Sequence, residues 1–339
     1  SALAHALKIL GDTHSLTRDH ARQAISEIVT GNVTDVSITA FLVGLRVKGE
    51  TDEELAGAVE AVREVMTPFN TNCRPVLDTC GTGGDGAASV NVSTASAIVA
   101  AACGVAVAKH GNRSASGVSG SSEVLEELGV AINPQPSVQR RCLEELGLTF
   151  LFAPSFHPAL KHVAAVRKQL PFRTLFNLVG PLVNPARPEY QLVGVPQNRL
   201  AQLMANALAR LGVNRAAVVV GPEGIDEVGL AGPTQVLWVE NNEVESRIWL
   251  PEEFGLPRVS ATELRVADPA ESAHRIRRML QGEVGPVRSV VLANVAAALM
   301  VCGRAENLCD GVRQAVDSID TGRAQELLDR WILLSHEGA

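Results

Sequence analysis

Val76-Leu77-Asp78-Thr79-Cys80-Gly81-Thr82-Gly83-Gly84-Asp85-Gly86 is the most informative stretch of this 339-residue sequence. Its apolar start is typical of a short buried strand, and four glycines within six positions follow directly. Such a loop can adopt positive φ angles and direct several backbone N–H groups at one anion. A few residues later, Asn91-Val92-Ser93-Thr94 opens an Ala- and Val-rich helix over 93–103, whose free N–H groups and hydroxyls suit a second phosphate. The stretch therefore predicts a phosphate site between a strand and a helix.

The same loop permits two other interpretations. Glycine turns after strands are common, so a purely structural turn stays open. Gly81, Gly83 and Gly86 also satisfy the GxGxxG pattern of dinucleotide-binding folds. Those folds place an acidic residue about 20 positions further on to hold a ribose, and residues 98–108 contain neither Asp nor Glu. Asp85 would repel a bare pyrophosphate but suits phosphates accompanied by a metal ion, so a nicotinamide cofactor is disfavoured.

A second polar loop, Lys109-His110-Gly111-Asn112-Arg113-Ser114-Ala115-Ser116-Gly117, begins where the next predicted strand, 105–108, ends. In open α/β sheets, ligands bind beyond the carboxyl ends of the strands, so the two loops are expected side by side. Lys109 can neutralise phosphate charge, and Ser121 opens the following helix. Taken alone, this loop could equally be an ordinary solvated loop. Its position one strand after the glycine loop favours a ligand site.

The periodicity predicts two domains. Residues 1–70 read as helices only, with a capping box at Thr51-x-x-Glu54, and 68–75 breaks the pattern as a hinge would. Short strands then alternate with helices over 74–339, which predicts an α/β domain with a mostly parallel central sheet and flanking helices. Helices from about 157–185 are expected to join the small all-helical domain. The predicted strands are 76–78, 105–108, 150–152, 190–195 and 216–220.

Composition excludes several classes of protein. A net charge of -7 and a pI near 5.7 argue against a basic surface for nucleic acid. No run approaches the ~20 apolar residues of a membrane span, and the start, Ser1-Ala2-Leu3-Ala4-His5, lacks the pattern of a signal peptide. The six cysteines form no CxxC pair, which favours reduced thiols and a cytoplasmic enzyme over disulfides or zinc.

Several motifs in one order resemble the anthranilate phosphoribosyltransferase family of tryptophan biosynthesis. The resemblance spans essentially the whole chain, and the order of long motifs is far more specific than any one of them. The motifs are Asp78-x-x-Gly81-Thr82-Gly83-Gly84-Asp85-Gly86, Asn91-x-Ser93-Thr94, Lys109-His110-Gly111-Asn112-Arg113, His157-Pro158-Ala159-x-Lys161, Val166-Arg167-Lys168, Arg173-Thr174-x-Phe176-Asn177-x-x-Gly180-Pro181-Leu182-x-Asn184-Pro185 and Gly224-Ile225-Asp226-Glu227.

The resemblance implies transfer of the phosphoribosyl group of 5-phosphoribosyl 1-diphosphate to anthranilate, with magnesium, two ions being expected, and a homodimer formed by the N-terminal helices. It implies catalytic roles for Lys109, His110 and Arg167, and magnesium contacts for Ser93, Asp226 and Glu227. Anthranilate would meet Gly81, His110, Asn112, His157, Arg167 and Pro181. The phosphoribosyl donor would meet Gly81, Gly84, Asp85, Ser89, Asn91, Val92, Ser93, Thr94, Lys109, His110, Gly111, Asn112, Arg113, Ser114, Ala115, Ser116, Gly117 and Ser121.

Read without the resemblance, some of these residues are less distinctive. Asp226-Glu227 differs from the other acidic pairs by following a buried strand and a glycine loop, where carboxylates suit magnesium. Arg167 alone would read as a surface arginine, and His157 as a satisfied cap. Two departures from the family pattern, Thr79-Cys80 and Pro171-Phe172, bear on pocket or hinge shape.

Three rival functions stay open at this point. A pyrimidine nucleoside phosphorylase resembles the family in fold but uses phosphate and a nucleoside. A nucleic-acid-binding relative would have a degraded glycine loop and a basic face, which this sequence lacks. A nicotinamide oxidoreductase would bind NAD. For the transferase, an uncharged aromatic amine needs no strong base, so catalysis is expected to rest on positioning and on stabilising the departing diphosphate, with the helical unit closing about 68–75.

Overall fold

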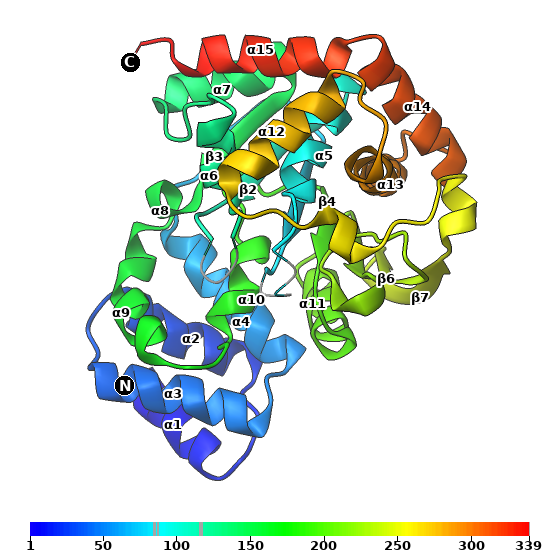
Figure 1. Ribbon diagram of the computed structural model, residues 1–339. Helices are drawn as coiled ribbons and strands as arrows, with labels where there is room; N and C mark the ends of the chain where they lie inside the picture. The colour runs from blue at the N-terminus through cyan, green and yellow to red at the C-terminus, as the bar shows by residue number, and fades with distance from the viewer. Residues whose placement is uncertain (84–85, 87, 115–117, 339) are drawn as a thin grey trace.

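One mixed β-sheet runs through the larger domain (Figure 1). The computed structural model describes residues 1–83, 86, 88–114 and 118–338. Over these residues the strand order is β3-β2-β1-β4-β5-β6-β7; β1 to β5 are parallel, and β6 and β7 are antiparallel. The mostly parallel sheet is therefore confirmed. The strands are β1 Val76–Gly81, β2 Ala106–Gly111, β3 Leu148–Phe152, β4 Tyr190–Gly194, β5 Arg215–Val220, β6 Thr234–Glu240 and β7 Glu243–Trp249.

The register brings the carboxyl ends of the parallel strands to one edge. Gly81 of β1 pairs with Gly194 of β4, and Leu77 of β1 pairs with Val107 of β2. The β6–β7 hairpin was not predicted; it turns through Asn241-Asn242, both at positive φ (54° and 62°), a conformation that asparagine tolerates in tight hairpin turns. The two loops with the phosphate pattern therefore leave the same edge of the sheet.

Helices cover both faces of the sheet. One face carries the larger apolar core, built around α5 (Val92–Ala102) and α13 (Pro286–Val301), the latter buried along almost its whole length. The other face packs against α11 (Asn198–Arg210) and continues into the N-terminal helices. The remaining helices of this domain are α6 Ser121–Glu127, α7 Pro136–Leu146, α12 Pro269–Leu280, α14 Leu308–Asp320 and α15 Arg323–Ser335, with 3-10 turns η3 Pro222–Gly224, η4 Pro251–Phe254 and η5 Ala261–Leu264.

The N-terminal domain consists of four helices, α1 Ala2–Gly11, α2 Arg18–Val29, α3 Asp35–Lys48 and α4 Asp52–Val65. Thr51 and Glu54 form the predicted capping box, and the buried Glu54 pairs with Lys48 at 3.0 Å. Helix α9 (Lys161–Gln169) contacts α2 and α3, so the segment that follows β3 packs with this domain. That segment also contains α8 Ala153–Phe156, η1 Pro158–Leu160, α10 Phe176–Val179 and η2 Gly180–Leu182. The exact division at 1–70 and 74–339 stays a prediction.

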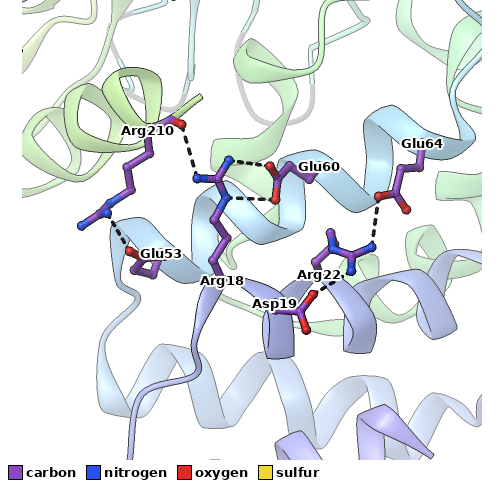
Figure 2. Close-up of polar contacts among 7 residues, drawn as sticks. All are labelled: Arg18, Asp19, Arg22, Glu53, Glu60, Glu64 and Arg210. Atoms are coloured by element: carbon purple, nitrogen blue, oxygen red, sulfur yellow. Dashed lines mark hydrogen bonds and ion pairs between the residues drawn. The ribbon is translucent and has the colours of Figure 1, made fainter. Parts of the chain in front are cut away.

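A polar network joins the two domains (Figure 2). Arg18 of α2 donates to Glu60 of α4 through Nε (3.0 Å) and to the Arg210 carbonyl of α11 through Nη1 (3.3 Å). Arg210 in turn pairs with Glu53 at 2.6 Å. These groups are partly exposed, so each pair contributes at most about 1 kcal/mol. The apolar packing of α4 on α11 contributes more to holding the domains together.

The segment 68–75 is anchored at several points. Phe69 is buried against Phe156, and its N–H donates to the Pro185 carbonyl at 3.2 Å. Arg74 donates to the Arg187 carbonyl through Nη1 at 3.0 Å and to the Ala186 carbonyl through Nη2 at 2.7 Å. Closure about this segment stays a prediction.

Among the helices of the described residues, none is long and apolar enough to cross a membrane.

Candidate active site

The glycine loop that follows β1 is hydrogen-bonded to Asp226 of the acidic pair Asp226-Glu227. Thr82 N donates to the Gly194 carbonyl at 2.9 Å, and Gly83 N donates to Oδ2 of Asp226 at 2.8 Å. A Cβ on Gly81 would lie 2.5 Å from the same carboxylate oxygen. The structure thus brings together two motifs that are far apart in the sequence, and a side chain at position 81 would displace the Asp226 carboxylate.

The backbone of Asp226-Glu227 crosses the ends of β4 and β5. A Cβ on Gly194 would lie 1.6 Å from the Asp226 carbonyl oxygen, and one on Gly221 would lie 2.4 Å from that of Glu227. Only glycine leaves room for these approaches. The acidic segment is therefore pressed onto the carboxyl edge of the sheet, next to the end of β1.

Lys109 lies beneath this edge and is almost fully buried, at 1% exposure. Its Nζ donates to the Thr79 carbonyl at 2.6 Å and to Oγ of Ser93 at 3.0 Å. Burial lowers the pKa of Lys109, and the carboxylates of Asp78 and Glu227 oppose that shift. A small cavity of about 10 Å³ lies among these groups; it is lined by Thr79, Cys80, Ser93, Ser96, Leu192, Gly194, Val219, Glu227 and Asn294. Ser93 and Glu227 thus border one cavity, and Lys109 is bonded to Ser93.

The predicted helix start at Asn91 is confirmed as the N-cap of α5. Its Oδ1 accepts from Thr94 N at 3.0 Å and from Ser93 Oγ at 3.3 Å. The side chain of Val92 is buried in the core, so only its backbone could meet a ligand. Asn91 N donates to Ser272 Oγ at 2.9 Å.

The C-terminal half of the chain holds the preceding segment. Ser89 forms an antiparallel bridge with Arg265, and Val90 N donates to the Leu264 carbonyl at 2.8 Å. Nothing in residues 264–272 resembles a binding motif, so the sequence does not predict these contacts.

The second loop is anchored through Asp78 of β1. This carboxylate is fully buried and accepts from His110 N at 3.2 Å and from Nδ2 of Asn184 at 2.8 Å. Burial raises the pKa of Asp78 to about 6, against the opposing effect of Lys109. Asn184 also donates to the Ala108 carbonyl at 2.8 Å. Asp78 and Asn184 thus tie the two strand-end loops to the segment that leads into β4.

Other residues of the second loop face different partners. Arg113 pairs with Glu126 at 2.8 Å on the surface, so its guanidinium already has a carboxylate partner. Ser114 N donates to Glu123 Oε2 at 3.0 Å. Gly111 lies against Ser121, because a Cβ there would be 2.9 Å from Ser121 Oγ. The Asn112 side chain accepts from Arg113 N at 2.8 Å. The predicted residues Gly84, Asp85, Ala115, Ser116 and Gly117 lie outside the described residues.

Two buried histidines meet at this edge. Nε2 of His110 and Nε2 of His157 are 3.1 Å apart. Burial lowers the pKa of His110 to about 3 and that of His157 to about 4, so both rings are neutral at pH 7. One ring donates and the other accepts, and neither adds charge to the site.

The residues assigned to anthranilate from α9 and η2 occupy different environments. Arg167 of α9 is partly buried, which lowers the pKa of its guanidinium, and no described residue pairs with it. Pro181 is buried, and its carbonyl accepts from Gln191 at 2.9 Å.

Arg173 lies in one of the motifs that resemble the family, and the resemblance implies no role for it. Its Nη2 donates to the Thr82 carbonyl at 2.6 Å, which bonds the segment after α9 to the glycine loop. The motif marks this residue but not its partner, which is a backbone atom 91 residues away.

The side chains beside the glycine loop bear on magnesium binding. Among the described residues, no group of three or more His, Cys, Asp or Glu side chains could hold a metal ion. Two carboxylates and one hydroxyl next to the glycine loop nevertheless match an ion that takes few protein ligands and shares the rest with substrate phosphates and water. Asp226 already faces the loop, so the residues fit a metal that arrives with a phosphorylated substrate.

Comparison with known proteins identifies the family. Residues 73–325 match the a/b domain of a glycosyl transferase family, and residues 4–66 match its helical bundle domain. An anthranilate phosphoribosyltransferase of Methylobacterium radiotolerans is 47% identical over 337 residues, covering 98% of this chain and 96% of that protein. The crystal structure of anthranilate phosphoribosyltransferase from Thermus thermophilus is similar with a TM-score of 0.92 and 40% identity, over 97% of this chain and 99% of that one. The chain belongs to the anthranilate phosphoribosyltransferase family.

A family member from Saccharomyces cerevisiae, solved in complex with PRPP and Mg, has a TM-score of 0.90 and 27% identity, over 98% of this chain and 97% of that one.

The departures from the family pattern can be placed in the fold. Thr79 is buried and donates to the Ser93 carbonyl at 3.0 Å, and Cys80 is buried beside it. Phe172 is 37% exposed, next to Arg173.

Proposed function

We propose that this chain transfers the 5-phosphoribosyl group of 5-phosphoribosyl 1-diphosphate to anthranilate, at the edge formed by the glycine loop, the second loop and the acidic pair. The observation that carries the proposal is the bond from Gly83 N to Asp226, together with the bond from the buried Lys109 to Ser93 at the start of α5. Anion donors, a buried cation and hard carboxylates converge there, as a diphosphate with a divalent metal requires.

We assign magnesium to Ser93, Asp226 and Glu227, and we expect two ions. When bound, magnesium neutralises charge on the diphosphate as it leaves. The assignment is supported by the position of both residues beside the end of β1, because Asp226 accepts from Gly83 N and Glu227 lines the same small cavity as Ser93 and Cys80.

Lys109 and the backbone N–H groups of the loops bind and orient the donor. The bond from ribose C1 to the diphosphate oxygen breaks, and its electron pair leaves with the diphosphate. The amine nitrogen of anthranilate then forms the new bond to C1 and releases its proton to solvent. The neutral pair His110 and His157 lines the site without opposing the positive charge that develops at C1. Catalysis thus rests on positioning and electrostatics.

The remaining site residues are part of the same proposal. Arg167 is assigned to the anthranilate carboxylate, because its guanidinium has no partner among the described residues and arginine binds carboxylates in a bidentate manner. Pro181 and Asn112 complete that pocket. The donor is assigned to Gly81, Gly84, Asp85, Ser89, Asn91, Val92, Ser93, Thr94, the residues Lys109 to Gly117, and Ser121.

We also propose a cytoplasmic homodimer. Val36 and Val47 of α3 are 78% and 80% exposed, which supports an apolar contact through the N-terminal helices. All six cysteines carry free thiols, in keeping with a reducing compartment. Sedimentation velocity should show a dimer that Val36→Glu with Val47→Glu converts to monomer; an unchanged dimer in that variant would place the interface elsewhere.

The function is tested by the decay of anthranilate fluorescence. Decay should require both 5-phosphoribosyl 1-diphosphate and magnesium, and chelation by EDTA should abolish it. A parallel assay with thymidine and phosphate tests the nucleoside phosphorylase alternative. Thymidine cleavage without anthranilate consumption would overturn the proposal.

A further inference from the structure

A buried asparagine forms hydrogen bonds with the backbone of Val228, directly after the acidic pair. Asn294, in the middle of α13, is 1% exposed. Its Oδ1 accepts from Val228 N at 3.0 Å, and its Nδ2 donates to the Val228 carbonyl at 2.9 Å. The second amide hydrogen reaches the Val290 carbonyl, also at 2.9 Å. The side chain therefore binds both backbone groups of the residue that follows Glu227, as a neighbouring strand would.

The hydrogen bonds of Asn294 add to the contacts that fix the backbone of the acidic segment, residues 226–228. Gly194 and Gly221 press against the backbone of Asp226 and Glu227 from the sheet. Asn294 binds the next residue, Val228, from a helix whose neighbouring positions are valine, alanine and leucine. A lone amide in such an apolar helix is unfavourable unless every polar atom is bonded.

Asn294 and Glu227 also border the same small cavity, together with Ser93 and Ser96. The Ser96 hydroxyl is buried and makes no hydrogen bond within the described residues. The amide thus borders the same cavity as Ser93 and Glu227, two of the three residues assigned to magnesium.

We propose that Asn294 is a positioning residue for the magnesium-binding carboxylates, which it orients by fixing both backbone groups of Val228. This inference rests on the proposed function. Residues that orient metal ligands without touching the metal typically change its affinity by roughly 10- to 100-fold when replaced. Asn294 therefore acts on magnesium-dependent donor binding and leaves anthranilate binding unaffected.

The test measures binding without turnover. Calorimetric titration with 5-phosphoribosyl 1-diphosphate, in the absence of anthranilate, is repeated over a series of magnesium concentrations. Asn294→Leu, which keeps the size of the side chain, should raise the magnesium concentration for half-maximal donor binding roughly tenfold. The KM for anthranilate, measured at saturating magnesium and donor, should change by less than about twofold.

Gln139 provides the matched control. It is a helical amide, 2% exposed, whose Nε2 donates to the Phe150 carbonyl of the sheet at 3.3 Å. Gln139→Leu removes a comparable buried hydrogen bond away from the acidic pair, so it should lower stability without moving the magnesium dependence. Equal magnesium dependence in Asn294→Leu and Gln139→Leu would overturn the inference.

Two further variants separate the possible failures. Asn294→Ser removes the amide that binds Val228 without adding a charge, and it should shift the magnesium dependence in the same direction as Asn294→Leu. It takes the place of the leucine variant if that variant does not fold. Glu227→Gln tests the metal assignment itself. A magnesium shift in Glu227→Gln but in neither Asn294 variant refutes only the role of Asn294, whereas an unchanged Glu227→Gln refutes the proposed metal site.

Discussion

Gly194→Ala directly tests how closely the acidic pair approaches the sheet. The new methyl group would lie 1.6 Å from the Asp226 carbonyl oxygen and 2.4 Å from its carbonyl carbon, whereas ordinary contacts begin at 3.4 Å. The methyl and the oxygen must therefore separate by about 1.8 Å, the difference between 3.4 and 1.6 Å. Strand β4 is held between β1 and β5, so the segment that carries Asp226 is the part that moves.

The displacement predicts both a catalytic and a stability effect. A misplacement of about 1 Å can lower a rate about 100-fold, so kcat/KM should fall by at least about that factor. Overpacking of a well-packed site typically lowers the free energy of unfolding by about 1–3 kcal/mol. The activity loss should therefore exceed what partial unfolding can explain at 25 °C.

The assay is the decay of anthranilate fluorescence at several magnesium concentrations, with urea unfolding in parallel. Gly11→Ala is the control, because a Cβ at Gly11 meets no atom within 4 Å. A Gly194→Ala enzyme that keeps more than about a tenth of the kcat/KM of the control would refute the reasoning, since the carboxylates would then tolerate the shift.

Three further predictions concern other contacts. Arg167→Ala should raise the KM for anthranilate far more than the KM for the phosphoribosyl donor; equal effects in steady-state kinetics would contradict its role. Burial lowers the pKa of His157 to about 4, so the unfolded chain takes up the proton first, and stability falls as the pH drops from about 6.5 towards 4. Between pH 7 and pH 5 this ring should account for about 2 kcal/mol of the fall in the free energy of unfolding, and His157→Gln should remove that part of the fall in urea unfolding. An unchanged pH dependence in the variant would show that the ring is not buried in its neutral form. Arg18→Ala should lower the free energy of unfolding by at most about 1 kcal/mol, and 1 M salt should reduce this effect. A larger loss that salt does not change would show that Arg18 stabilises the protein by packing and not by charge.

Much of the site could be predicted because its signals are local. The glycines after β1, the N-cap at Asn91 and the polar loop after β2 each lie within a few residues of a strand end. Parallel pairing then places neighbouring strand ends together, so Lys109 and Ser93 could be predicted to lie close without knowing the side-chain contact.

The missed residues share a different property, because each acts through a backbone partner far away in the sequence. Arg173 bonds to the Thr82 carbonyl, Ser272 accepts from Asn91 N, and Asn294 clamps Val228. An isolated arginine, serine or asparagine among apolar residues carries no periodic or spacing signal. Only the fold shows what each of them touches.

The sequence by itself determined the class of the fold and the chemistry of its loops, because hydrophobic period, glycine content and helix caps act between near neighbours. Tertiary structure alone decided that the Asp226 carboxylate accepts from Gly83 N, and that Gly194 had to lack a side chain for that to happen. The physical reason is steric and long-range. The approach of one backbone to another across a sheet edge depends on how the whole core packs, and no stretch of sequence records that distance.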